Sequence, residues 1–214
     1  MIDCYNTIDG EFSVTKIIEK SKFICYLKSV DNEEQAKEFI LRIKKQNSLA
    51  THNCYAYIAD ENGLVMKFSD DGEPQGTAGL PMLEVLKNKK IHKVVAVVTR
   101  YFGGIKLGTG GLTRAYSGSV SSCLEQTSIV VKRLAVLCNL TCNYENYPKL
   151  KKVLDNINVC MLDTFFNNDI TLTFAVKSDY LSKLKDNLSN LFKGNYALLE
   201  NGIGYYPFGD ICQK

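Results

Sequence analysis

Two neighbouring segments carry the most informative patterns of this sequence, SDDGEPQGTAGLPMLEVL over residues 69–86 and VVAVVTRYFGGIKLGTGGLTRAY over residues 94–116. Val94 to Val98 are consecutive apolar residues, which is typical of a strand buried on both faces. A loop rich in Gly, Pro and Asp precedes a predicted helix at about 78–88, and a second glycine-rich loop leads into a predicted helix from about Leu112 to Thr127. The stretch therefore predicts a buried strand connected to helices by two unusual loops.

The residues before this stretch predict two strands, a helix and a hairpin. Residues 11–30 have the pattern of two short strands with a turn near Glu19 to Ser21. Apolar residues at helical spacing predict a helix over 32–46, with Asp31 and Glu34 as its capping pair. Residues 52–59 and 64–68 read as strands joined by Asp60-Glu61-Asn62-Gly63, a hairpin signal.

Composition shifts near residue 130, where the glycines become sparse and a new pattern of elements begins. Apolar residues then follow with alternating (strand) or helical spacing. The resulting order of elements is β-α-β-β-α-β, the split, ferredoxin-like arrangement. The predicted ranges are 134–142, 150–157, 159–166, 169–176, 181–191 and 195–206. The overall fold class predicted is α+β in two domains.

Length and composition limit the class of protein. The chain has 214 residues, 45% hydrophobic and 23% charged, which suits one large or two small globular domains. No apolar run approaches the length of a membrane span, and the start, MIDCYNTIDGEF, lacks the pattern of a signal peptide. We therefore expect a cytoplasmic protein with no membrane partner and with its eight cysteines as reduced thiols.

Charge is distributed unevenly along the chain. The net charge of +3 is too small to indicate nucleic acid by itself. Between Glu84 and Glu125, however, there is no acidic residue, while this stretch contains seven Lys and Arg residues. This arrangement suits an anionic ligand, and the alternative is an ordinary solvated surface.

The second glycine-rich loop is a candidate anion site. Glycine lets the backbone approach a ligand closely, and the first N–H groups of the following helix attract negative charge. The loop matches neither a Walker motif nor the dinucleotide-binding pattern. The alternative is that its glycines serve tight turns and close packing. The candidate anion- or phosphate-binding residues are Arg100, Lys106, Gly108, Thr109, Gly110, Gly111 and Arg114, with Tyr101 and Phe102 as candidates for stacking on a base.

The first loop carries acids that suit two interpretations. Asp70, Asp71 and Glu73 could bind Mg²⁺ or Ca²⁺, but adjacent Asp residues before Gly more commonly form turns. His52 is more typical of a hydrogen-bonded structural residue than of a catalyst. The sequence contains no C-x-x-C pair and no nucleophile with its base. We therefore predict no catalytic residue, no metal and no cofactor.

The same stretch resembles the YigZ/IMPACT family. The residues that carry the resemblance are Ala50–Tyr57, Ser69–Pro74, Gly76–Gly79, Pro81-Met82, Val97–Gly104, Lys106–Leu112 and Arg114–Tyr116. It covers roughly residues 15 to 128, and the remainder is similar, more loosely, to the C-terminal domain of bacterial members. The resemblance implies a ribosomal protein S5 domain-2-like fold for residues 1–130 and a ferredoxin-like domain for residues 131–214.

What the resemblance implies about function is less specific. Family members are largely uncharacterised, and the eukaryotic ones are linked to translational control through a regulator of a starvation kinase. Both fold relatives occur among proteins that touch RNA or the ribosome, which is analogy at the level of fold. Some relatives carry a peptidase label, for which this chain offers no metal ligands or nucleophile.

Three function hypotheses follow. The first is a non-enzymatic RNA- or ribosome-associated factor in translation or stress regulation, with Lys93, Arg100, Lys106 and Arg114 on phosphates. The second is an enzyme acting on a phosphorylated small molecule or nucleotide, with the glycine-rich loop on the phosphate. The third is a protein-interaction module, for which a translation-regulatory protein would be the partner.

Overall fold

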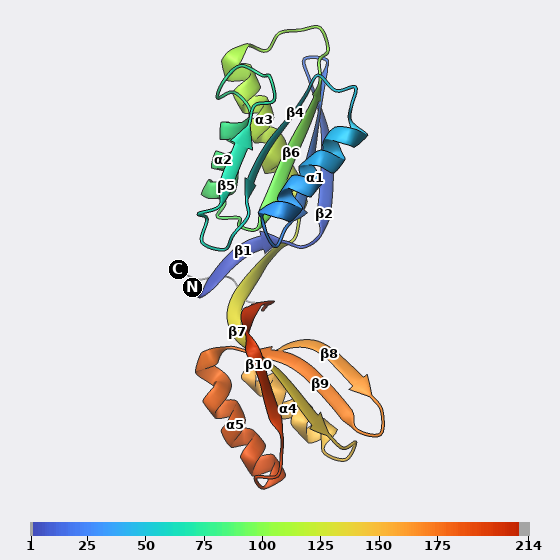
Figure 1. Ribbon diagram of the computed structural model, residues 1–214, viewed down its shortest axis with the longest axis vertical. Helices are drawn as coiled ribbons and strands as arrows, with labels where there is room; N and C mark the ends of the chain where they lie inside the picture. Colours follow the sequence, from blue (N-terminus) through green and yellow to red (C-terminus); the bar gives the residue numbers. More distant parts are fainter. Residues whose placement is uncertain (1, 210–214) are drawn as a thin grey trace. The chain divides into compact units, whose positions relative to one another are not determined.

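The computed structural model describes residues 2–209, and the chain divides into two compact units, residues 1–130 and 131–214. Figure 1 shows a sheet with helices in each unit, so the predicted α+β class is confirmed. Among the described residues, no helix is both long and apolar enough to cross a membrane.

The first unit contains six strands and three helices among the described residues. They are β1 (Cys4–Ile8), β2 (Glu11–Ile18), β3 (Ser21–Ser29), α1 (Glu33–Gln46), β4 (His52–Ile58), β5 (Met66–Ser69), α2 (Gly79–Asn88), β6 (Val94–Tyr101) and α3 (Gly108–Glu125). Five of the strands form a sheet in the order β2-β3-β6-β4-β5, in which every neighbouring pair is antiparallel.

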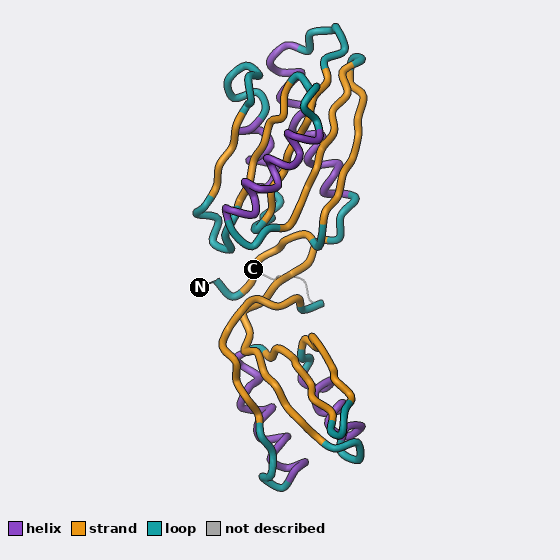
Figure 2. Tube along the Cα trace, turned by 45° about the vertical axis from the view of Figure 1, so that its right-hand side comes forward, coloured by secondary structure: helices purple, strands orange, loops and turns teal. Residues whose placement is uncertain are grey.

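Helices cover both faces of this sheet (Figure 2). Helix α1 packs on one face, where Phe39 and Ile43 join Val95 and Val97 in a buried cluster. Helices α2 and α3 pack on the other face with the alternate residues of the same strands. Strand β6 is therefore buried on both sides, as its apolar run predicts.

The starts of helices α1 and α3 differ from their predicted positions. The N-cap of α1 is Asn32, whose side chain accepts from the Gln35 amide, so the cap lies one residue after the predicted Asp31. Helix α3 begins at Gly108 instead of Leu112. The low helix propensity of glycine argues against this first turn, and tertiary packing of the helix overrides it.

The second unit has the predicted β-α-β-β-α-β order. Its elements are β7 (Ile129–Cys142), α4 (Tyr147–Ile157), β8 (Cys160–Phe166), β9 (Ile170–Val176), α5 (Ser178–Phe192) and β10 (Leu198–Pro207). The strands lie in the order β10-β7-β9-β8 and are antiparallel. Leu150, Leu154, Leu184 and Leu188 from the two helices close the core on one face of this sheet.

The cysteines fit the sequence prediction only in part. Among the described residues, six of them, including Cys25, Cys54 and Cys123 in the first unit, carry free thiols, and Cys212 lies outside the described residues. Cys4 is disulfide-bonded, so the expectation of thiols throughout is wrong at this position. No sequence pattern signalled this bond, because cysteine spacing alone does not determine connectivity.

Candidate functional site

The residues singled out in the sequence gather at one end of the first unit. Figure 1 shows that the β2–β3 turn, the loop before β4, the loop after β5 and the loop after β6 lie at this end of the sheet. Hydrogen bonds join them. The Phe102 amide donates to Thr51 Oγ1 at 3.0 Å, and the Asn53 amide donates to Asp71 Oδ2 at 2.7 Å. Antiparallel pairing of β3, β4 and β6 thus assembles segments that are far apart in the sequence.

The β6–α3 loop is seated directly on the β2–β3 turn. The Gly103 amide donates to Ser21 Oγ at 3.1 Å, and a Cβ at Gly103 would lie 2.1 Å from the Lys20 backbone. Glu19 and Lys20 form this tight turn with φ values of 44° and 63°. Gly103 is therefore required for close approach of two backbones, which is one of the two roles considered for the glycines.

The acids of the first loop act mainly as turn and cap residues. Asp70 accepts from the amides of Gly76, Ala78 and Gly79 at 2.8 to 3.0 Å and so holds the start of α2. Asp71 accepts from Lys44 Nζ at 2.6 Å in addition to the Asn53 amide. The described residues contain no group of three or more His, Cys, Asp or Glu arranged to hold a metal.

Glu73 is the centre of a buried polar network. Its Oε1 accepts from Arg100 Nη1 and from the Tyr116 hydroxyl, both at 2.7 Å. The side chains of Glu73 and Arg100 are only 3% and 6% exposed. The network therefore ties the acidic loop to strand β6 and helix α3 from the interior.

Arg100 belongs to a row of side chains that crosses the sheet. Strand register places His52, Arg100, Phe23 and Lys16 side by side on β4, β6, β3 and β2. The Arg100 guanidinium lies between two rings, 5.4 Å from the centroid of Phe23 and 5.3 Å from that of Phe102. Arg100 is one of the predicted anion-binding residues, and the structure buries its guanidinium, pairs it with Glu73 and packs it against these two rings.

The two ring nitrogens of His52 face the Asp71 backbone and the Glu73 carboxylate. Its Nδ1 lies 2.9 Å from the Asp71 carbonyl oxygen, so Nδ1 carries a proton and donates. Its Nε2 lies 3.9 Å from Glu73 Oε2. The interpretation of His52 as a hydrogen-bonded structural residue agrees with this geometry.

Cys54 and Tyr116 complete the network and were not singled out in the sequence. Cys54 Sγ donates to the Asp70 carbonyl at 2.9 Å. Burial raises the pKa of the Cys54 thiol to about 12, with smaller contributions from the negative charges of Glu73, Asp71 and Asp70. Burial also raises the pKa of Tyr116. A thiol with a raised pKa is a poor nucleophile, so Cys54 is suited to packing.

The two aromatic candidates for stacking differ in exposure. Tyr101 is partly buried, and its hydroxyl donates to Asn47 Oδ1 at 3.0 Å, so its ring is tied to the α1–β4 connection. Phe102 is 46% exposed. Phe102 therefore presents more of its ring to a stacking base than Tyr101 does.

The remaining anion candidates lie around the first turns of α3. Lys106, Gly108, Thr109, Gly110 and Arg114 are exposed, and Leu107 at the N-cap makes no side-chain capping bond. A pocket of about 410 Å³ is lined by Ile18, Glu19, Ile105, Lys106, Leu107, Gly111, Arg114 and Ala115. The structure thus brings Lys106, Gly111 and Arg114 together and separates them from buried Arg100.

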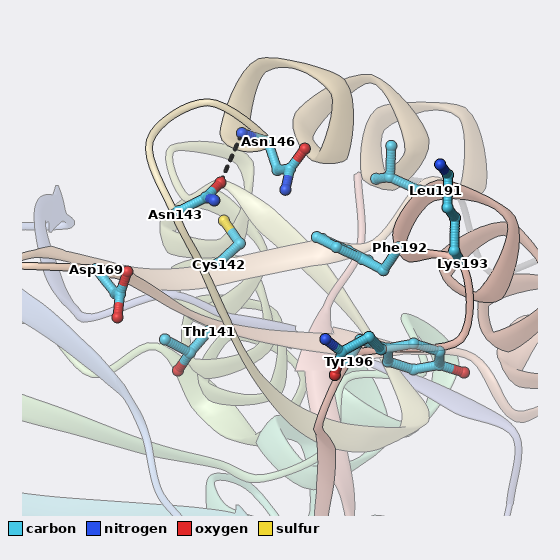
Figure 3. Close-up of a pocket in the computed structure, with 10 residues that line it drawn as sticks. Thr141, Cys142, Asn143, Asn146, Asp169, Leu191, Phe192, Lys193 and Tyr196 are labelled. Carbon is cyan, nitrogen blue, oxygen red and sulfur yellow. Dashed lines mark hydrogen bonds between the residues drawn. The ribbon is translucent and has the colours of Figure 1, made fainter.

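A second pocket, of about 390 Å³, lies in the second unit (Figure 3). It is formed where β7 and the β8–β9 turn meet the start of α4 and the end of α5. Asp169 and Lys193 supply one charge of each sign, and Asn143 and Asn146 supply amides. Because these charges oppose each other, this pocket is less suited to a phosphate than the one beside α3.

Comparison with known proteins defines the class to which this chain belongs. The Impact N-terminal domain matches residues 19–124, the segment that builds the network and the glycine-rich loop. Relatives that match nearly the whole chain show that the protein belongs to the IMPACT family.

Two bacterial relatives and one solved structure show the extent of the similarity. The IMPACT family member YvyE of Bacillus subtilis is 39% identical, over 96% of this chain and 98% of the relative. The IMPACT family member YigZ of Escherichia coli is 33% identical, over 87% of this chain and 93% of the relative. A crystal structure described as that of a hypothetical protein aligns with a TM-score of 0.63 at 31% identity, over 93% of this chain and 98% of the other.

Proposed function

We propose that this IMPACT family protein is a non-enzymatic RNA-binding factor that acts on the ribosome or in translational and stress regulation. The observation that carries the proposal is the pocket beside the first turn of α3, where Lys106 and Arg114 flank Gly111. Helix N-termini and basic side chains together favour phosphate oxygens. The exposed ring of Phe102, in the same loop, offers a surface for an unpaired base.

The charges that line this pocket determine how tightly we expect it to bind RNA. Glu19 also lines it and opposes the two cations, while the adjacent Lys20 is exposed and adds positive charge. A small number of phosphate contacts predicts weak, salt-dependent binding of single-stranded RNA. Removing the charge of Glu19 should strengthen it.

The buried network favours this function over the enzymatic alternative. An enzyme acting on a phosphorylated small molecule would need a base or metal ligands facing the pocket. Asp70, Asp71 and Glu73 are instead occupied by backbone amides, Lys44, Arg100 and Tyr116. The contacts of this loop support a role in holding α3 and the glycine-rich loop in place.

The finer fold assignments belong to the same proposal. For residues 131–214 we propose a ferredoxin-like domain, because the strand order β10-β7-β9-β8 accompanies the β-α-β-β-α-β sequence. For residues 1–130 we propose the ribosomal protein S5 domain-2-like fold that the family resemblance implies. Fold analogy alone does not establish function, so the binding experiment decides.

The experiment is the fluorescence anisotropy of a labelled single-stranded RNA titrated with protein at several salt concentrations. We expect micromolar binding that weakens steeply with salt, and a logarithmic salt slope that falls by about 0.7 for each phosphate-contacting cation removed. Lys106→Gln and Arg114→Gln test the cations, Phe102→Ala tests stacking, and Glu19→Gln should tighten binding.

The control is Lys89→Gln, an exposed lysine that follows α2 at the other end of the first unit. It removes the same charge at a distance from the pocket, so it should leave affinity nearly unchanged. Absence of binding at low salt, or equal weakening by Lys89→Gln and Lys106→Gln, would reject the proposal.

A further inference from the structure

Strand β5 forms an open edge of the sheet in the first unit. In the order β2-β3-β6-β4-β5, it pairs with β4 on one side and with no other strand of residues 2–209. The Ala59 amide donates to the Val65 carbonyl across this pair. Since backbone groups alternate along an antiparallel strand, Lys67 and Ser69 also bond to β4, while Met66 and Phe68 direct their N–H and C=O groups to the free edge.

The side chains along this edge are unusually apolar for an exposed surface. Leu64 is 80% exposed, and Val65, Met66, Phe68 and Leu80 are each at least 40% exposed. Met66 and Phe68 lie opposite Ile58 and Ala56, so they share the face that α2 covers. The opposite edge strand, β2, instead exposes the polar residues Glu11, Ser13 and Thr15 beside Ile17. An open edge with exposed apolar side chains is a site for strand addition.

The charges around β5 indicate which strand would add. Residues 59–86 contain six acids and one base. Four of these acids form ion pairs with cations outside residues 59–86. The pairs are Lys93–Glu61, Lys44–Asp71, Arg100–Glu73 and Lys87–Glu84. The other two, Asp60 and Asp70, accept backbone amides and lie one on each side of β5 in the chain.

We propose that β5 is a docking edge for an extended, basic and apolar segment of a partner protein, which adds to the sheet as a further strand. Backbone bonds to Met66 and Phe68 would supply affinity, and alternate apolar side chains would pack against Met66, Phe68 and Leu80. Basic side chains would meet the negative charge of Asp60 and Asp70. A second copy of this chain is disfavoured as the occupant, because it would bring the same carboxylates together.

The test uses a labelled, end-capped peptide of alternating lysine and valine, which places valine on one face of an extended strand. Its anisotropy is measured against the full chain, and we expect saturable binding. Met66→Pro removes an amide that faces the free edge without removing a bond to β4. We expect it to weaken binding about tenfold, because strand addition depends on backbone hydrogen bonds.

Three controls separate strand addition from simple charge attraction. A peptide methylated on alternate backbone amides keeps its charge. Its affinity for the parent protein should be as low as the affinity of the unmethylated peptide for the Met66→Pro variant. A peptide with glutamate in place of lysine should not bind. Asp60→Asn keeps an acceptor for the Val65 amide but removes the charge, and should weaken binding by a smaller factor than Met66→Pro.

Two results would overturn the proposal. One is equal binding of the methylated and unmethylated peptides to the parent protein, a result that does not depend on the folding of any variant. The other is a concentration-dependent dimer in sedimentation velocity that Met66→Pro abolishes, which would assign the edge to a second copy.

Discussion

Glu73 Oε1 and Arg100 Nη1 lie 2.7 Å apart in a buried ion pair that joins the loop after β5 to strand β6. The same carboxylate oxygen accepts the Tyr116 hydroxyl, so one atom connects the acidic loop, the central strand and helix α3. The position of the glycine-rich loop depends on this connection, because the loop runs from the end of β6 to the start of α3. The polar core of this unit therefore supports the surface that we propose for RNA.

Removing one partner of this pair should destabilise the first unit strongly. Arg100→Met leaves the Glu73 carboxylate buried without its counter-charge, and we expect a loss of about 3–5 kcal/mol in the free energy of unfolding. Urea denaturation of the variant measures it. The double variant Arg100→Met/Glu73→Leu removes both charges and should recover much of this loss. A single variant as stable as the parent would contradict a structural role for the pair.

Tyr116→Phe tests the other hydrogen bond to Glu73. It removes only the hydroxyl from a fully buried ring, and a hydrogen bond to a charged group contributes about 1.5–3 kcal/mol. Tyr101→Phe is the matched control, because its partly buried hydroxyl donates to the neutral amide oxygen of Asn47. Thermal unfolding should show a clearly larger loss for Tyr116→Phe than for Tyr101→Phe, and equal losses would refute the special role of Glu73.

Two glycines of the same stretch should respond to alanine in opposite directions. A methyl group at Gly103 would meet the Lys20 backbone at 2.1 Å, so Gly103→Ala must displace the loop or the β2–β3 turn. We expect a loss of more than about 2 kcal/mol, as for other strained or overpacked sites. Gly110 lies in α3, where a methyl group would point into open space, so Gly110→Ala should stabilise by about 0.5–1 kcal/mol. Denaturation of both variants under one condition measures the two changes in the free energy of unfolding. A loss at Gly103 together with a gain at Gly110 would show that close packing requires glycine at the first position and not at the second.

Sequence patterns predicted the elements well because most of their signals are local. The apolar run of β6, the stripe of α1 and the alternation in β7 and β9 each reflect burial of one or both faces, and each lies in the predicted region, although β7 begins at Ile129 instead of residue 134. Strand β1 was missed, since its five residues CYNTI carry no clear alternation.

The candidate site was harder to predict because it depends on pairing between distant residues. Arg100 and Arg114 look alike in the sequence, but strand register places the first beside Phe23, where it is buried and pairs with Glu73, while the second lies exposed on α3. The apolar neighbours of Arg100 in β6 were a signal that it faces the interior. Nothing local indicates that Glu73 would meet it, since 27 residues separate the two.

Arg114→Ala should separate binding from stability. Because Arg114 is exposed, we expect the free energy of unfolding to change by less than about 0.5 kcal/mol. RNA affinity should fall and the salt slope should decrease, since a phosphate contact is lost. Anisotropy and urea denaturation on the same preparation measure both quantities. Affinity equal to that of the parent would remove Arg114 from the proposed site.

Alkaline pH should destabilise the protein through Cys54. Burial raises the pKa of its thiol from 9.0 to about 12, so the folded state holds this proton more tightly than the unfolded state does. The resulting stability is fully present below pH 9 and is lost as the pH rises toward 12. Within this range the thiol contributes a decline of up to about 1.4 kcal/mol per pH unit.

Cys54→Ala isolates this contribution, since Tyr116 and Cys25 also have raised pKa values and remain in the variant. The variant loses the bond from Sγ to the Asp70 carbonyl and should be less stable than the parent at neutral pH. Its stability should nevertheless fall less steeply above pH 9, so the two curves converge as the pH increases. Urea denaturation at intervals from neutral pH up to the pKa of about 12 follows them, and parallel curves would show that the thiol does not titrate from a buried state.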